Sequence, residues 1–320
     1  MYNINLIISK IGNSFYKYTL TKNIHSYILR SNIKKTKEEN MKRAIIILLA
    51  AVLLCVAGCK KEAEKTTLTV AMSPDFSPME FVDTGKSGQD QYVGFDITLA
   101  NYLAKELGLT LEIKPMSFDA CQTAVQLGSV DMSISGFSWT AEREENFLIS
   151  DYYIAGDNET EQSVITSKDK EGTMTAAESF AGLKVGAQAA SLQEKLVQEA
   201  LIPAGAELVV YKSIDDAVLA LQTGKIDALA VAHGNGEAII SNNPDIAFAG
   251  YDFEVDPKYE NNVILLNKNS SELLARVNAA LAKALEANYY DGWYEEAKAL
   301  AGISTAAEVS YNDDGTAPTE

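Results

Sequence analysis

The sequence predicts an α/β protein built from two similar lobes, and three observations support this prediction. Short apolar strands alternate with helical stretches between residues 66 and 302, which is the pattern of α/β domains. A helix–glycine–strand unit occurs twice, at an offset of 96 residues. Of the 320 residues, 47% are hydrophobic and 22% are charged, so the chain can bury the core of one to three domains.

The first elements follow in order from hydrophobic periodicity. Residues 68–72 (LTVAM) predict a strand, and a helix follows from Asp96, with its apolar side chains on one face up to Leu107. Gly108 is typical of a helix end. Residues 109–113 alternate as in a strand, and a second helix over 119–127 ends at Gly128 and leads into a strand over 131–135.

The second of these helices and its strand recur later in the chain. Six identical residues occupy matched places in the two copies: Ser117/Ser213, Asp119/Asp215, Ala124/Ala220, Gln126/Gln222, Gly128/Gly224 and Asp131/Asp227. Two such units predict two lobes, although a coincidence of common α/β turn residues is the alternative. Ligand sites in α/β sheets lie beyond the carboxyl ends of the strands. We therefore expect a cleft between Ser135-Gly136 in one lobe and Val231-Ala232 in the other.

Charge and residue counts argue against several function classes. The chain has 27 Lys and Arg against 44 Asp and Glu, and the part after residue 58 has 18 against 42. So acidic a surface argues against binding to nucleic acid or to anionic lipid. With three cysteines, two histidines and no Cys/His cluster at metal-ligand spacing, we expect no disulfide scaffold, metal or other cofactor. With two histidines in the chain, there are few candidates for the catalytic base of a Ser–His or Cys–His hydrolase.

The N-terminal region resembles a bacterial lipoprotein signal. Lys42 and Arg43 precede an apolar run over 44–56, and the segment ends in Val56-Ala57-Gly58-Cys59. The run is short for a membrane-spanning helix, and its layout is that of a secretory signal peptide. We expect residues 41–58 to be the signal and Cys59 to be lipid-modified. A plain buried or membrane helix is the alternative.

The segments that flank the signal and the folded part carry no apolar periodicity. Residues 1–40 precede a complete signal peptide, so we interpret them as an over-extended start or an unstructured extension. Residues 59–67 are rich in charge and suit a tether between lipid and domain. We expect residues 303–320 to form a mobile tail.

One short segment has the chemistry of an anion site. Thr140 can cap a helix whose first turn contains Arg143, and a helix start offers free N–H groups. The planar guanidinium of arginine can grip a carboxylate through two parallel hydrogen bonds. The alternative is that Arg143 pairs with neighbouring glutamates on a solvated face.

Taken together, eight short motifs resemble the bacterial extracellular solute-binding proteins of family 3, the receptors for polar amino acids in ABC import. In order, they are residues 74–81 (PDFSPMEF), 93–97 (VGFDI), 128–131 (GSVD), 135–138 (SGFS), 140–143 (TAER), 151–153 (DYY), 182–188 (GLKVGAQ) and 224–228 (GKIDA). The resemblance covers roughly residues 66–302. Each motif is weak alone, and their order and spacing make the match specific.

The resemblance implies a two-lobed periplasmic-binding-protein fold of type II. Each lobe would be a mostly parallel sheet flanked by helices, with the ligand in the cleft between lobes. Residues 68–160 and 255–302 would form lobe 1, and residues 161–254 lobe 2. The implied protein is an extracytoplasmic, lipid-anchored, monomeric receptor that binds an amino acid and delivers it to an ABC permease.

The resemblance also implies a set of ligand-binding residues. Arg143 would bind the ligand carboxylate, with the help of Ser138, Thr140 and Ser191. Gly136 would offer backbone groups to the α-amino end, and Ser135 would also belong to the ligand-binding set. Phe76 and Phe118 stand where the family has aromatic walls, and core packing is the alternative for both.

Lobe 2 departs from the family pattern. Members commonly have an Asp for the ligand ammonium at the position of Ala232. Either Glu237 or Asn235 takes its place, or the ligand is not an ordinary α-amino acid. His233 could face the cleft, where its charge would vary near neutral pH, or be a structural residue.

The charge of the ligand side chain is suggested by the segment before Phe76. Members that bind cationic side chains often have an acid at the position of Ser73, and this chain does not. Asp75 lies close by but, by strand alternation, should point away. We therefore expect a neutral ligand.

Two other functions remain open at this stage. The same fold hosts a cyclohexadienyl dehydratase, which would need an acid or base in the cleft, and Glu237 and His233 are the nearby candidates. A sensory or scavenging binding protein without a transporter would use the same cleft as an import receptor.

Overall fold

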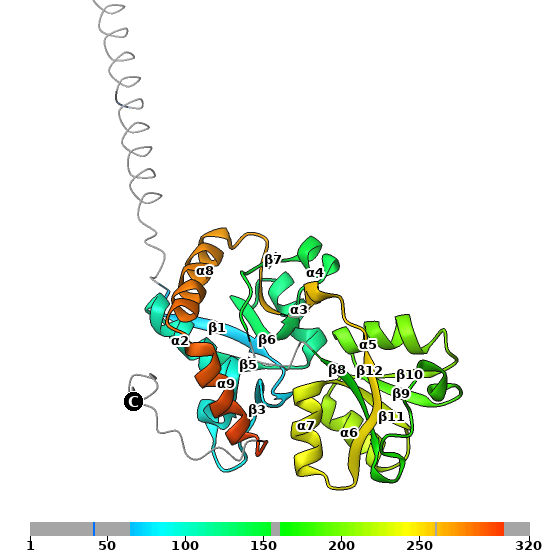
Figure 1. Ribbon diagram of the computed structural model, residues 1–320. Coiled ribbons are helices and arrows are strands. Elements are labelled where there is room, and N and C mark those ends of the chain that lie inside the picture. The colour runs from blue at the N-terminus through cyan, green and yellow to red at the C-terminus, as the bar shows by residue number, and fades with distance from the viewer. Residues whose placement is uncertain (1–40, 42–64, 155–160, 260, 304–320) are drawn as a thin grey trace, which may run out of the picture. The chain divides into compact units, whose positions relative to one another are not determined.

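The computed structural model describes residues 41, 65–154, 161–259 and 261–303. Residues 65–303 hold two lobes, each built on a five-stranded sheet, with the helices arranged around the sheets as Figure 1 shows. The extension over residues 1–40, residues 42–58 of the expected signal peptide, Cys59, the tether up to residue 64 and residues 304–320 of the expected tail lie outside the described residues.

The sheet of lobe 1 has the strand order β5-β1-β6-β13-β7. β1 pairs in parallel with β5 and β6, whereas β13 runs antiparallel to β6 and β7. The bounds are β1 Thr67–Met72, β5 Thr110–Pro115, β6 Met132–Ser138, β7 Leu148–Ile149 and β13 Asn262–Leu266. A small sheet joins this lobe, with β2 Asp75–Phe76, β3 Glu80–Val82 and β4 Tyr92–Val93.

Helices cover both faces of this sheet. α2 packs against α8 and α9 on one face, and α3 lies on the other. The bounds are α2 Phe95–Leu107, α3 Phe118–Gln126, α4 Ala141–Asn146, α8 Ser271–Glu286 and α9 Tyr289–Leu300, with a short helical turn at Gly88–Gln91.

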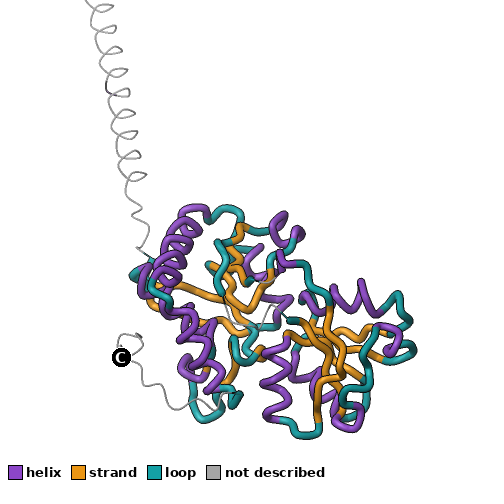
Figure 2. Tube along the Cα trace, in the orientation of Figure 1, coloured by secondary structure: helices purple, strands orange, loops and turns teal. Residues whose placement is uncertain are grey.

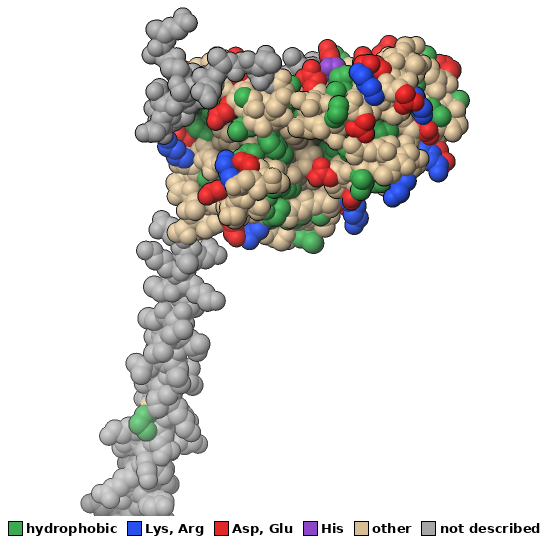
Figure 3. Space-filling view, turned by 90° about the horizontal axis from the view of Figure 1, so that it is seen from below, with side chains coloured by type: hydrophobic (Ala, Val, Ile, Leu, Met, Phe, Trp, Pro, Cys, Tyr) green, Lys and Arg blue, Asp and Glu red, His purple; other side chains and the backbone are tan. Residues whose placement is uncertain are grey.

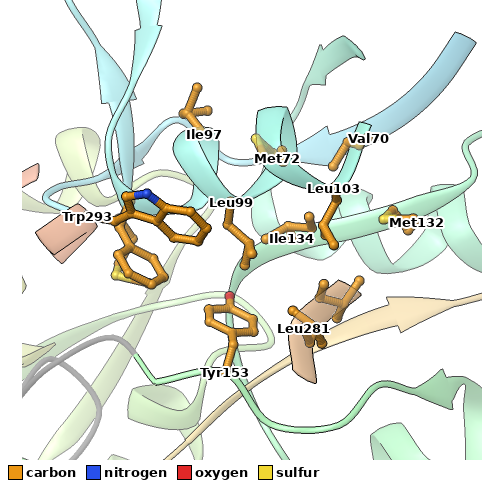
Figure 4. Packing of buried hydrophobic residues seen from close by; sticks show 14 of the residues in the cluster. Val70, Met72, Ile97, Leu99, Leu103, Met132, Ile134, Tyr153, Leu281 and Trp293 are labelled. Atoms are coloured by element: carbon orange, nitrogen blue, oxygen red, sulfur yellow. The ribbon is translucent and has the colours of Figure 1, made fainter. Parts of the chain in front are cut away.

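Alternate residues of the lobe 1 strands supply two different cores. Val70, Met72 and Ile134 face the cluster under α2, α8 and α9, whereas Ala71 and Phe137 face α3. Figure 4 shows the first cluster, in which Ile134 lies among side chains of α2 and near Tyr153. A sheet buried on both faces explains why β13, an inner strand of the sheet, is apolar from Val263 to Leu266.

The sheet of lobe 2 repeats the arrangement, with the order β10-β9-β11-β8-β12. β9 pairs in parallel with β10 and β11, and β8 runs antiparallel to β11 and β12. The strands are β8 Gln162–Ser167, β9 Lys184–Gln188, β10 Glu207–Tyr211, β11 Ala228–Ala232 and β12 Ile246–Phe253; the helices are α5 Leu192–Leu196, α6 Ile214–Gln222 and α7 His233–Asn242. Short helical turns occupy Lys168–Lys170, Ala177–Phe180, Val197–Leu201 and Pro257–Tyr259.

In each lobe, the antiparallel fourth strand is the first one after the chain arrives from the other lobe. β8 follows the passage out of lobe 1, and β13 follows the return. The two passages meet where Tyr153 and Asn262 form an antiparallel bridge. Figure 2 shows the strands of the two lobes as separate groups.

The internal repeat predicted from the sequence is confirmed. α3–β6 and α6–β11 occupy corresponding places in the two sheets, and Gly128 and Gly224, which link helix to strand, have φ of 66° and 68°. This left-handed conformation costs a residue with a Cβ about 1–2 kcal/mol, which explains the glycine in both copies.

Candidate ligand-binding site

The site is built where β6 ends and α4 begins. Thr140 caps α4, its Oγ1 accepting a hydrogen bond from the backbone N–H of Arg143 at 3.1 Å. The cap places Arg143 in the first turn, and the side chain is only 4% exposed. Arg143 therefore does not belong to a solvated face.

The guanidinium of Arg143 is held by both lobes. Its Nη1 donates to the carbonyl oxygen of Ser138 in lobe 1 at 2.6 Å, and its Nη2 donates to the carbonyl oxygen of Ala190 in lobe 2 at 3.0 Å. Cζ lies 5.5 Å from the ring centroid of Phe118 and 5.1 Å from that of Phe137. Cation–π attraction at this range orients the charged group further.

Lobe 2 supplies the opposite wall through the turn between β9 and α5. Ser191 caps α5 by accepting from the N–H of Glu194 at 3.0 Å, and its hydroxyl donates to the carbonyl of Gln188 at 2.7 Å. Ala190 has a φ of 61°, a conformation that costs a non-glycine residue about 1–2 kcal/mol. This strained residue presents its carbonyl oxygen to Arg143.

A small space of about 20 Å³ lies between these walls, which is room for about one water molecule. We call it the enclosed space because residues of both lobes line it. The lobes are closed beside it, since Arg143 donates to Ala190 and Ile214 donates to Asp75 across the cleft. The enclosed space is lined by Phe76, Phe118, Gly136, Ser138, Arg143, Gln188, Ser191, Leu192 and Gln193. Beside it, an open groove of about 570 Å³ runs between α3 and α4 of lobe 1 and α5 of lobe 2, and it shares Arg143 and Ser191 with the enclosed space.

Most of the residues expected from the sequence are brought together here. Six of the ten line the enclosed space: Phe76, Phe118, Gly136, Ser138, Arg143 and Ser191. Thr140 lines the outer groove and fixes Arg143 through the helix cap.

Ser135 faces away from the space. Its Oγ donates to Glu80 Oε1 and accepts from the N–H of Ser73 at 3.0 Å. Because side chains alternate along a strand, Gly136 faces the cleft and Ser135 the interior of lobe 1.

His233 and Glu237 are also outside the enclosed space. His233 stacks on Phe248, with ring centroids 4.6 Å apart and planes at 3°, and its Nδ1 lies 2.9 Å from Ser163 Oγ. The carboxylate of Glu237 lies 3.9 Å from His233 Nε2 and is 46% exposed. Neither side chain is among the residues that line the space.

Three polar residues near the space were missed by the sequence reasoning. Gln188 and Gln193 line it, and Gln188 could have been found because it ends a parallel strand. Asp75 is not among the residues that line the space; it faces lobe 2, where its Oδ2 accepts from the N–H of Ile214 at 2.8 Å and from Gln188 Nε2 at 3.2 Å. Alternation did not predict this because β2 is only two residues long.

Two buried carboxyl groups lie behind Gly136. The N–H of Gly136 donates to Asp96 Oδ2 at 2.8 Å, and the hydroxyl of Tyr153 donates to the same oxygen at 3.1 Å. Glu80 and Asp96 interact electrostatically, and both side chains are fully buried. Burial raises the pKa of Asp96 to about 7 and, together with the charge of Asp96, raises the pKa of Glu80 as well. Both shifts favour the protonated carboxyl over the carboxylate.

Other chemistry is sparse among the described residues. They contain no group of three or more His, Cys, Asp or Glu side chains that could hold a metal ion. Burial raises the pKa of the Cys121 thiol, so it is not an activated nucleophile. No helix in the described part of the chain is long and apolar enough to cross a membrane. On the face in Figure 3, acidic and basic side chains are interspersed.

The fold defines a class of protein: a two-lobed protein of the periplasmic-binding-protein type, in which residues of both lobes face the cleft. The sequence matches the model of the bacterial extracellular solute-binding proteins, family 3, over residues 68–297. The chain belongs to this family.

The sequence matches to named relatives cover nearly the whole length of those relatives. The arginine-binding extracellular protein ArtP of Bacillus subtilis (strain 168) is 29% identical over 254 residues, which are 78% of this chain and 94% of the relative. The lysine/arginine/ornithine-binding periplasmic protein of Escherichia coli (strain K12) is 28% identical over 256 residues, 78% of this chain and 95% of the relative.

Solved structures of amino acid-binding proteins are also similar to this chain. An amino acid ABC transporter substrate-binding protein of Streptococcus pneumoniae, AbpA, bound to L-arginine, is 35% identical with a TM-score of 0.67, over 75% of this chain and 97% of that chain. An ancestral arginine-binding protein bound to glutamine is 31% identical with a TM-score of 0.65, over 73% of this chain and 98% of that chain.

Proposed function

We propose that the protein is an extracytoplasmic receptor that binds a small, neutral, polar amino acid between its lobes and delivers it to an ABC permease. The observation that carries the proposal is the buried guanidinium of Arg143, held at the boundary of the lobes by a carbonyl from each. A ligand held there touches both lobes and thereby favours the closed state.

Arg143 is suited to bind the ligand carboxylate. Its backbone is fixed by the cap of Thr140, and its head is fixed by the carbonyl of Ser138 and the rings of Phe118 and Phe137. Such preorganisation reduces the entropy lost on binding. The fork of the guanidinium matches the two oxygens of a carboxylate.

The lining of the enclosed space favours a neutral ligand. Its polar side chains are amides, hydroxyls and the guanidinium, and no Asp or Glu is among the described residues that line it. A cationic ligand side chain would lose its water without gaining a carboxylate, which is costly. The amides of Gln188 and Gln193 can instead pair with neutral polar groups.

The names of the relatives include both charged and neutral amino acids as ligands. Several carry names with arginine, lysine or histidine, and one is named as a cystine-binding protein. The ancestral arginine-binding protein has been solved with arginine and with glutamine, so this architecture accepts a charged and a neutral side chain.

A non-catalytic role fits the placement of the acid–base candidates. An enzyme needs a proton donor or acceptor within reach of the bound substrate, and His233 and Glu237 lie outside the enclosed space. A sensory receptor would use the same site, and uptake of labelled ligand by cells with and without the gene separates it from an import receptor.

The ligand class can be tested by thermal shifts with the twenty common L-amino acids. A ligand at a thousand times its Kd adds about 4 kcal/mol, or about 8–16 °C for a chain of this size. We expect such shifts from one or a few neutral polar amino acids. The largest shift from arginine or lysine would refute the neutral ligand, and no shift from any amino acid would refute the receptor function.

The role of Arg143 has a matched control in Arg276, whose Nη2 donates to the carbonyl oxygen of Leu107 in lobe 1. Lysine keeps the charge but lacks the planar fork. We expect Arg143→Lys to weaken binding of the best amino acid by about 10- to 100-fold, and Arg276→Lys to leave it unchanged. Equal affinities of both variants would place the carboxylate elsewhere.

Membrane attachment through Cys59 completes the proposal. It rests on the lipobox-like segment before Cys59. Cells that express the protein should incorporate labelled palmitate into it, and Cys59→Ser should abolish both the label and membrane association. We also propose a monomer, for which light scattering of the purified protein should give the mass of one chain.

A further inference from the structure

We propose that Asp75 is a positioning residue that latches the two lobes together: its carboxylate, in lobe 1, caps the start of α6 in lobe 2 when the cleft is closed. This latch lies beside the proposed ligand-binding site. Only the binding measurement in its test rests on the proposed function.

The carboxylate of Asp75 is bound from both sides of the cleft. From its own lobe, Ser73 Oγ donates to Oδ1 at 2.8 Å. From lobe 2, the N–H of Ile214 donates to Oδ2 at 2.8 Å and Gln188 Nε2 donates to the same oxygen at 3.2 Å. One side chain thus joins two separate elements of the opposite lobe.

The group that Asp75 meets in lobe 2 is chemically suited to it. Ile214 is the first residue of α6, a helix of nine residues, and the N–H groups of a first turn have no partner inside the helix. The same end carries the positive pole of the helix dipole, which favours a carboxylate. A charge-assisted hydrogen bond of this kind is about twice as strong as a neutral one.

A second hydrogen bond beside Asp75 also joins the two lobes. Asn235 Nδ2, on α7, donates to the carbonyl oxygen of Ser77 at 2.8 Å, and Asn235 is only 1% exposed. The segment from Asp75 to Ser77 therefore meets β9, α6 and α7. In Figure 1 the small sheet of lobe 1 lies beside α6 and α7.

These contacts favour closure because separation of the lobes breaks them. Opening would return the Asp75 carboxylate and the Ile214 N–H to water, so the contacts contribute to the closed state only. The apparent affinity for a ligand rises with the population of the binding-competent state. Asp75 therefore raises affinity without touching the ligand, and by the same factor for every ligand that the closed cleft accepts.

Other titratable groups face this site. Asp215, in the first turn of α6, and Glu80, behind β2, both interact electrostatically with Asp75. Burial raises the pKa of Asp75 because it removes water from the charged carboxylate. This loss of hydration offsets part of the attraction between the carboxylate and the N–H of Ile214. Replacement by Asn removes the charge while keeping an acceptor oxygen, so Asp75→Asn isolates the charge and Asp75→Ala removes the contact.

The test measures the distance between lobes in the full chain. Spin labels on p-acetylphenylalanine at Gln126 and Gln198, which flank the groove from lobe 1 and lobe 2, report the distance by pulsed electron resonance without using cysteines. We expect the short-distance population of the ligand-free protein to fall by about 10-fold or more in Asp75→Ala and by less in Asp75→Asn. Asp216→Asn, an equal charge change on an exposed residue of α6, should leave it unchanged.

Binding of L-glutamine and L-arginine provides the second readout. A latch predicts that Asp75→Ala weakens both by the same factor, about 10- to 100-fold. Selective loss of arginine would overturn the latch, because it would make Asp75 a direct partner of the ligand cation. A lowered melting temperature with an unchanged distance distribution would also overturn it. If the wild type binds neither amino acid, the proposed function fails, and the ligand-free distances still decide the latch.

Discussion

Glu80 and Asp96 make the stability of lobe 1 dependent on pH, and replacing Asp96 by Asn should remove the part of that dependence that comes from Asp96. Asn keeps an oxygen that can accept from the N–H of Gly136 and the hydroxyl of Tyr153, the two donors to Asp96. Its amide also offers a donor to Glu80 that never titrates.

The magnitude follows from the displaced pKa. The carboxyl of Asp96 has its ordinary pKa of 3.8 in the unfolded chain, whereas burial raises this pKa to about 7 in the folded protein. Since the folded pKa is the higher one, the folded state binds the extra proton, and its stabilising contribution is complete below pH 4 and is lost as the pH rises to about 7. Each unit corresponds to 1.36 kcal/mol, so the full loss is about 4 kcal/mol, of which about 3 kcal/mol falls between pH 5 and 8.

Urea unfolding at a series of pH values measures this directly. The free energy of unfolding of the wild type, relative to Asp96→Asn, should fall by up to about 3 kcal/mol from pH 5 to pH 8. Asp90→Asn makes the same charge change on the exposed surface of lobe 1 and should give a curve parallel to the wild type. Parallel curves for Asp96→Asn and the wild type would refute the raised pKa of Asp96.

Two further substitutions test the local structure around the cleft. Thr140→Ala removes the cap of α4 and should lower the free energy of unfolding by about 1 kcal/mol. It should also weaken amino acid binding, because the backbone N–H of Arg143 loses its acceptor. An unchanged dissociation constant would show that the cap does not position the guanidinium. Gly236→Ala would place a Cβ 2.8 Å from Phe248 and should cost about 1–3 kcal/mol by overpacking, measured by thermal unfolding; a variant as stable as the wild type would mean that α7 moves aside easily.

Local patterns predicted the elements that frame the site. The apolar spacing of α2, the glycines after α3 and α6, and the threonine three residues before Arg143 all act within a few residues of the chain. Hydrogen bonding along one helix and burial of one face determine such features. The predicted strand 131–135 was shorter than β6, which continues to Ser138, because Gly136 hid the end of the apolar run.

The partners of single polar groups could not be found in this way. Glu80 and Asp96 are 16 residues apart, and Asp75 and Ile214 are separated by 139, so no local pattern links them. His233, a candidate for the cleft, is instead stacked on Phe248 of the neighbouring strand.

The sequence by itself determined the α/β class, the doubled helix–strand unit and the place of Arg143 at a helix start, because each depends on contacts between residues close together in the chain. Only the tertiary structure decided which polar groups meet across the cleft and which carboxyl groups are buried together. Those pairings depend on the packing of two sheets and on burial from water, which brings together residues far apart in sequence and sets the strength of their interaction.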